Sequence, residues 1–154
     1  MGTIIRIALR FLRQVLKRGG RGRVTTPRPP RGPVPPGVRR LPSGRLPPNY
    51  RYAGRVYDGP QWTRQLAQRY PNGVRFTNDG FPNFGPYATH TARFPNGFRG
   101  TPADFAAANR QAGLARTPDG FTWHHHQDGR TLQLVPRDLH EAIRHAGGVA
   151  LMGG

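Results

Sequence analysis

Apolar and polar side chains alternate in two short segments of the last third of the chain. In the first segment, Phe121 and Trp123 alternate with smaller or polar residues, as in a half-buried β-strand. In the second, residues 132–135 alternate in the same way, and Pro136 ends the segment. Asp128-Gly129 lies between the two and is a strong signal for a hairpin turn. The pattern therefore predicts a two-stranded antiparallel hairpin.

A helical pattern follows the hairpin directly. Residues 137–148, RDLHEAIRHAGG, are predicted as a helix that Asp138 caps at its start and that Gly147-Gly148 ends. A short helix after a hairpin packs across the two strands, so the end of the first strand faces the start of the helix. We therefore expect an α+β fold built on a strand–turn–strand–helix core.

Further elements are expected before this core. Residues 101–114 form the clearest helix pattern in the chain, because Thr101 is a good N-cap and Asp104 follows it by three residues. Residues 60–70 also read as a helix, with a proline at its start. Residues 74–94 are rich in glycine, proline and aromatic residues, which predicts short strands joined by turns.

The first third of the chain differs in composition from the rest. Residues 1–55 hold 14 of the 24 basic residues and no acidic residue, so most of the net charge of +17 lies there. We divide the chain into a basic amphipathic helix (1–18), a linker rich in proline, glycine and arginine (19–56) and a folded body (57–154). The proline content predicts that the linker is disordered up to about Asn49.

The basic first third leaves several uses open. The helix over residues 3–18 can lie on an anionic membrane, dock on a partner or pack on the body. The arginines of the linker would attract any polyanion, or the linker is only a solubilising spacer. No run of about 18 apolar residues predicts a transmembrane helix, and Arg6 and Arg10 interrupt what would be the apolar part of a signal peptide. The chain lacks cysteine, which excludes disulfides and thiolate metal sites.

Five of the six histidines lie within residues 121–145. The core fold brings His124 and His125 of the strand close to His140 and His145 of the helix. Three neutral imidazoles suit a divalent transition metal, and a fourth can act as a general base. The alternative is a structural or solvated histidine tract. Two spacings complicate the metal hypothesis: positions 140 and 145 do not share one helical face, and positions 124 and 125 alternate across a strand.

The segment WHHHQDGRTLQLVPRDLHEAIRHAGG, residues 123–148, resembles the WHH branch of the HNH nuclease superfamily, which occurs as the toxic C-terminal domain of bacterial polymorphic toxins. The resemblance continues upstream and covers about residues 79–152. It implies a small ββα-metal (HNH-type) nuclease core with additional helices, which hydrolyses phosphodiester bonds of nucleic acids. The amphipathic helix and the linker lie outside it.

The resemblance also implies roles for the histidines. His124 would be a metal ligand and His125 the general base that deprotonates water. His140 would be a second ligand, and His145 a third ligand or a phosphate contact. The central asparagine of the HNH motif has no clear counterpart; Asp128 or His140 itself would stand in its place.

The sequence thus predicts a metal-dependent endonuclease, with a bacterial antibacterial toxin as the biological setting. The cofactor is a divalent ion (Mg²⁺, Mn²⁺, Ni²⁺ or Zn²⁺), the substrate DNA or RNA, and a cognate immunity protein is an implied partner. Arg130, Arg137 and Arg144 are the candidate nucleic-acid contacts. Delivery into a target bacterial cytoplasm would follow from a toxin role. The competing hypothesis is a non-enzymatic cationic protein that binds nucleic acid or membrane and whose histidines hold a structural metal.

Overall fold

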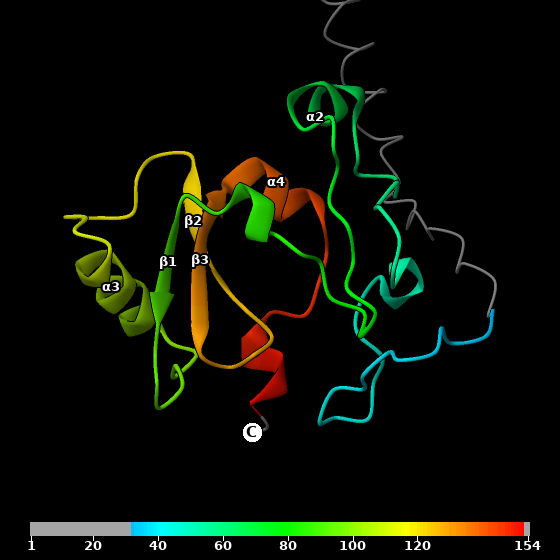
Figure 1. The fold of residues 1–154 in the computed structure, drawn as a ribbon, viewed down its shortest axis with the longest axis horizontal. Helices are drawn as coiled ribbons and strands as arrows, with labels where there is room; N and C mark the ends of the chain where they lie inside the picture. Colours follow the sequence, from blue (N-terminus) through cyan, green and yellow to red (C-terminus); the bar gives the residue numbers. More distant parts are fainter. Residues whose placement is uncertain (1–31, 153–154) are drawn as a thin grey trace, which may run out of the picture. The chain divides into compact units, whose positions relative to one another are not determined.

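The computed structural model describes residues 32–152, and a three-stranded antiparallel sheet lies at its centre. The strands are β1 (His90–Arg93), β2 (Phe121–His125) and β3 (Thr131–Pro136). Their order is β1-β3-β2, so β2 forms one edge of the sheet and β3 its centre. Figure 1 shows the three strands side by side. This arrangement confirms the small α+β fold, and the predicted hairpin is β2–β3.

The hairpin turn is formed by the predicted Asp128-Gly129 pair. Gly129 has a φ of +74°, a conformation that glycine adopts without steric cost. The Asp128 carboxylate accepts hydrogen bonds from the backbone N–H groups of Arg130 and Thr131, at 2.8 Å each. The turn therefore fixes the register in which His124 lies opposite Gln133.

The helices are short. The α-helices are α2 (Arg64–Arg69), α3 (Pro102–Gln111) and α4 (Arg137–Ala142), and the 3-10 helices are η1 (Tyr50–Tyr52), η2 (Gly85–Tyr87) and η3 (Gly148–Leu151). The predicted helix over 101–114 is α3, and Thr101 is its N-cap. The predicted helix over 60–70 begins later, at Arg64, because Thr63 is its N-cap and accepts from the N–H of Leu66 at 3.2 Å.

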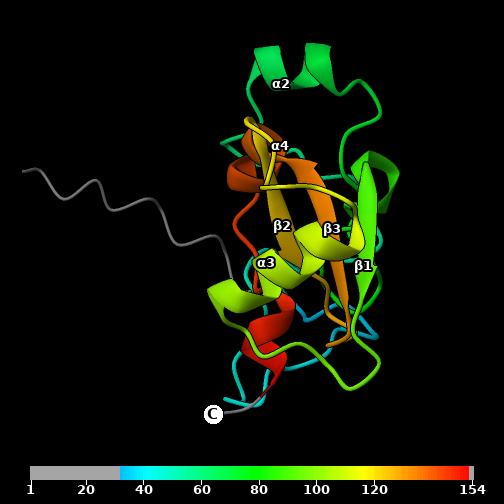
Figure 2. The same cartoon turned by 90° about the vertical axis from the view of Figure 1, so that its left-hand side faces the viewer.

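Different helices pack on the two faces of the sheet. Helix α3 packs on one face (Figures 1 and 2), where the core consists of Ala92, Phe98, Ala108, Trp123, Leu132 and Leu134. Helix α4 packs on the other, where Val135, Leu139 and Ile143 join the aromatic residues of the 57–84 region. Strand alternation therefore directs Trp123 and His125 toward the α3 side and His124 toward the α4 side.

Helix α4 is shorter than the sequence predicts. It ends at Ala142, and Ile143 has extended backbone angles (φ −118°, ψ 101°) with its side chain buried. Burial of Ile143 against the core takes the chain out of the helix before His145, which consequently lies on a loop. The N-cap is Pro136 rather than Asp138, whose carboxylate instead accepts from Tyr70 Oη at 2.7 Å.

The part of the predicted linker from Pro33 onward belongs to the same compact unit as the body. Arg39 donates its backbone N–H to Asp79 O at 3.0 Å, and Asn49 Nδ2 donates to Arg144 O at 2.7 Å. Pro47 is fully buried. The compact unit thus begins earlier than the predicted boundary at residue 57, because Tyr52 packs against the rings of Tyr57 and Phe76 and the polar contacts join the segment to the body.

The predicted amphipathic helix and the linker up to residue 31 lie outside the described residues. Within residues 32–152, none of the helices has the length and apolar character needed to cross a membrane.

Candidate metal centre

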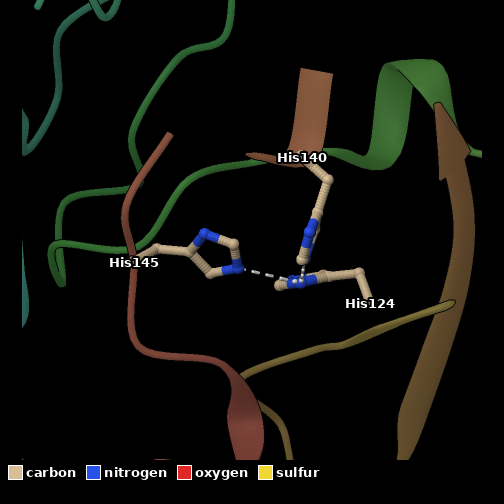
Figure 3. A group of neighbouring side chains, drawn as sticks. All are labelled: His124, His140 and His145. Carbon is tan, nitrogen blue, oxygen red and sulfur yellow. Dashed lines mark hydrogen bonds between the residues drawn. The ribbon is translucent and has the colours of Figure 1, made fainter. Parts of the chain in front are cut away.

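Three of the predicted site histidines come together on the α4 side of the sheet. His124 Nδ1 lies 3.3 Å from His140 Nε2 and 3.3 Å from His145 Nε2. One potential ligand nitrogen from each ring falls within 4.8 Å of the others. Figure 3 shows the three rings pointing toward one another from β2, from α4 and from the loop after α4. The early end of α4 is what allows positions 140 and 145 to converge despite their five-residue spacing.

The hydrogen bonds around the rings favour a cation between them. His145 Nδ1 lies 2.6 Å from the Ile143 carbonyl oxygen, which can only accept, so this nitrogen carries the proton and Nε2 presents a lone pair to the cluster. A proton on His124 Nδ1 can bond only one of its two neighbours. A divalent ion, in contrast, accepts a lone pair from all three nitrogens at once, and the donor set therefore fits a metal.

The electrostatics of the cluster keep the rings neutral, as metal ligands must be. Burial lowers the pKa of His124 well below its ordinary value, and the neighbouring His145 and His140 lower it further. Burial, followed by the proximity of His145, lowers the pKa of His140 to about 4. The pKa of His145 is lowered by burial, with a partial offset from the hydrogen bond to Ile143. All three imidazoles are therefore in their neutral form at neutral pH.

Phe84 forms an apolar wall against the three rings. Its ring centroid lies 4.9 Å from that of His124, 5.4 Å from that of His140 and 5.2 Å from that of His145. Phe84 is 1% exposed and His124 is 3% exposed, whereas His140 and His145 are partly exposed. Solvent therefore reaches the cluster from the side of His140 and His145.

His125, the predicted general base, does not join the three rings and lies on the opposite face of the sheet. Its Nε2 is 3.0 Å from Asp104 Oδ2, and its ring packs against Phe98 and Phe105 with centroid distances of 4.6 and 5.3 Å. The side chain of His125 is 12% exposed and that of Asp104 is 4% exposed. His125 is the last residue of the edge strand β2, and the segment after α4 lies beside it: a Cβ on Gly147 would be 3.8 Å from the His125 carbonyl oxygen.

Asp104 is a buried carboxylate at the start of α3. It accepts hydrogen bonds from the backbone N–H groups of Arg99 at 3.0 Å, Gly100 at 2.7 Å and Thr101 at 3.1 Å. Burial alone would raise the pKa of Asp104, but the hydrogen bonds from Arg99, His125, Thr101 and Gly100 bring it below its ordinary value. Asp104 is therefore ionised at neutral pH.

The remaining candidate residues are not part of the histidine cluster. Arg130, Arg137 and Arg144 are exposed. Arg137 donates to Phe121 O at 3.1 Å, and Arg144 accepts through its carbonyl from Asn49. Asp128 serves the hairpin turn, with its side chain bonded to Thr131 Oγ1 at 2.6 Å.

Residues 114–154 match the model of the WHH family, described as a nuclease of the HNH/ENDO VII superfamily with conserved WHH. The match confirms the resemblance and contains β2, β3, α4 and all three clustered histidines. Residues upstream of 114 fall outside the matched segment, including Phe84 and Asp104. No curated protein matches the chain.

The sequence alone does not indicate that two residues of this region contact the histidines. Asp104 reads as part of a helix cap, and nothing local indicates its contact with a histidine 21 residues later. Phe84 reads as one aromatic residue in a turn-rich segment. Strand alternation indicates only that His125 lies on the face of the sheet opposite His124, and it does not identify the residue that His125 contacts there.

Proposed function

We propose that this protein is a metal-dependent nuclease that hydrolyses phosphodiester bonds of DNA or RNA, with His124, His140 and His145 as the metal ligands. The observation that supports it most is the convergence of three neutral imidazoles on the β2–β3–α4 unit, inside the segment that matches the WHH family. A divalent ion bound there would offset the charge of the phosphate and stabilise the leaving oxygen.

His125 is the proposed general base. In this proposal the nucleic-acid backbone passes the end of β2, where adjacent residues present His124 to one face of the sheet and His125 to the other. His125 removes a proton from the attacking water, the new O–P bond forms, and the P–O bond to the leaving group breaks. The leaving oxygen then takes a proton from solvent water.

The donor set bears on the choice of metal. All three ligands are imidazole nitrogens, which suit Zn²⁺, Ni²⁺ and related transition ions, whereas Mg²⁺ prefers oxygen ligands in octahedral geometry. We therefore expect tighter binding of Zn²⁺ or Ni²⁺ than of Mg²⁺. Which ion supports the fastest cleavage is a separate question, since tight binding and turnover need not coincide.

A toxin role is the biological setting we propose, with a cognate immunity protein as partner and delivery into a target bacterium. It rests on the resemblance of residues 123–148 to the toxin branch of the superfamily. Arg130, Arg137 and Arg144 are exposed and flank β3 and α4, so they are the proposed phosphate contacts. The basic residues 1–31 add salt-dependent, sequence-independent affinity for nucleic acid.

The test is a cleavage assay with metal-stripped protein. Purified full-length chain is treated with EDTA, then incubated with plasmid DNA or total RNA and with Mg²⁺, Mn²⁺, Ni²⁺ or Zn²⁺. We expect cleavage to require added metal. His140→Ala should lose cleavage, and its metal affinity, measured by calorimetry, should fall as well. His90→Ala is the matched control, because His90 is exposed on β1 and outside the cluster.

Unchanged metal affinity in His140→Ala would remove this residue from the site. Metal binding without cleavage of either substrate, under every ion, would refute the nuclease proposal. That result would instead favour the cationic binding protein with a structural metal.

A further inference from the structure

We propose that Asp104 is a positioning residue for His125: through helix α3 it fixes both the orientation and the tautomer of this imidazole. The proposal rests on the proposed function, in which His125 takes the proton from water. Asp104 touches neither substrate nor metal in this scheme and acts only through the ring.

The first support is the way in which Asp104 is held. Its two carboxylate oxygens accept from three consecutive backbone N–H groups, of Arg99, Gly100 and Thr101, which lead into α3. A carboxylate with three such donors cannot rotate without breaking its hydrogen bonds to these N–H groups. The Asp104 oxygen that faces His125 is therefore held in place by hydrogen bonds from the backbone.

The second support is the chemistry of the contact. An ionised carboxylate can only accept hydrogen bonds, so the nitrogen facing it at 3.0 Å must carry the proton. In its neutral form, His125 thus carries the proton on Nε2 and has its lone pair on Nδ1. Because a neutral imidazole accepts a proton only at the nitrogen that lacks one, Nδ1 is the atom that can act as the base.

The third support is the packing of the ring. Phe98 contacts His125 edge-on, with an interplanar angle of 66°, and Phe105 lies tilted against it at 33°. These contacts restrict rotation of the ring about its side-chain bonds. Together, Asp104 fixes which nitrogen is free and the two phenylalanines restrict where that nitrogen points.

A purely structural role for Asp104, as the capping residue of α3, is the competing explanation. It predicts that loss of the carboxylate lowers stability and that activity falls only as far as folding does. The positioning role predicts a change in His125 itself and an effect on turnover that depends on the presence of His125.

The experiment compares Asp104→Ala and Asp104→Asn with Ala106→Gly in the full-length chain. Ala106 is exposed in the middle of α3, so its replacement by glycine weakens the same helix without touching Asp104 or His125. Asparagine keeps the shape of Asp104 and one oxygen, and it serves if the alanine variant does not fold.

The expected result is a fall in kcat of about 10²-fold or more for Asp104→Ala, with KM and metal affinity close to wild type. The Asp104→Asn variant loses less, because its oxygen can still accept from Nε2. Ala106→Gly keeps kcat. In the double variant Asp104→Ala/His125→Ala, activity is no lower than in His125→Ala alone, since Asp104 acts through the ring.

Nitrogen-15 NMR of the histidine rings gives a readout independent of cleavage. In the wild-type protein the His125 ring should be in the Nε2-protonated form, and Asp104→Ala should shift it to a mixture of the two tautomers. Multiplicative losses in the double variant, or a His125 tautomer that is the same with and without Asp104, would overturn the proposal. If the wild-type protein cleaves no substrate, the nuclease proposal fails, and the NMR comparison alone decides the role of Asp104.

Discussion

Replacement of Phe84 by leucine should weaken metal binding more than it weakens the fold. Phe84 is 1% exposed and contacts the rings of all three clustered histidines. Truncation of a buried phenylalanine to alanine costs about 3–5 kcal/mol, a large part of the roughly 5–15 kcal/mol that holds a domain together. Leucine keeps most of the apolar volume and costs on the order of 1–2 kcal/mol, so the variant stays folded.

The effect on the metal follows from the position of the ring. Leucine cannot maintain edge and tilted contacts with three imidazoles simultaneously, so at least one ring gains freedom to turn away from the cluster. Changes in the residues that orient metal ligands commonly reduce metal affinity about 10–100-fold. We expect a loss in this range for Phe84→Leu.

Phe81→Leu is the matched control. Phe81 is also 1% exposed and lies three residues earlier, but its ring faces the guanidinium carbon of Arg39, 5.5 Å from the ring centroid. Calorimetric titration of Zn²⁺ or Ni²⁺ into EDTA-treated protein measures affinity, and urea denaturation without metal measures stability. The reasoning is refuted if both variants bind metal with wild-type affinity, or if both lose affinity equally.

Two further predictions concern the start of η3 and the contact between Tyr70 and α4. Gly148→Ala should destabilise the protein by at least about 1–3 kcal/mol, because a Cβ there would collide with the His126 carbonyl oxygen and lie 2.7 Å from Phe98 Cζ. Gly147→Ala should be tolerated, since the nearest atom to its Cβ is 3.8 Å away; equal melting temperatures for the two variants would contradict this. Burial, and then the hydrogen bond to Asp138, raise the pKa of Tyr70 to about 12. Because the unfolded side chain ionises near pH 10, Tyr70 stabilises the fold fully below pH 10 and loses this contribution between pH 10 and 12. Tyr70→Phe should therefore flatten the fall in stability over that window, and an unchanged profile would argue against it.

The elements that the sequence predicts best are those determined by neighbouring residues. The hairpin depends on Asp128-Gly129, and the structure has both the left-handed glycine and the carboxylate bonds to the next two N–H groups. The start of α3 depends on Thr101 and Asp104, which lie within one turn of each other. Such signals are complete within a few residues, so no distant contact is needed to interpret them.

The length of α4 and the order of residues 33–56 depend on distant contacts. A helical pattern runs on to Gly147, yet burial of Ile143 pulls the chain into an extended conformation after Ala142. Residues 33–56 have a composition typical of a linker, but Asn49 and Arg39 bond to parts of the chain that are 95 and 40 residues away. Composition reports how much apolar surface a segment can bury, and it does not report polar partners elsewhere in the chain.

The same distinction applies to the paired histidines. Strand alternation predicted correctly that His124 and His125 lie on opposite faces, and this rule follows from backbone geometry alone. The contacts of each ring depend on elements that are distant in the sequence. His124 contacts residues of α4 and of the loop after it, and His125 contacts Asp104 of α3. A shift of β2 by one residue against β3 would exchange the two environments and place the wrong imidazole in each. The Asp128 turn holds that register where the two strands meet, and the hydrogen bond from Trp123 Nε1 to Asn109 Oδ1, at 2.8 Å, ties the middle of β2 to α3. Two adjacent and chemically identical side chains can therefore carry different functions, because the edge strand presents one to each layer of the fold.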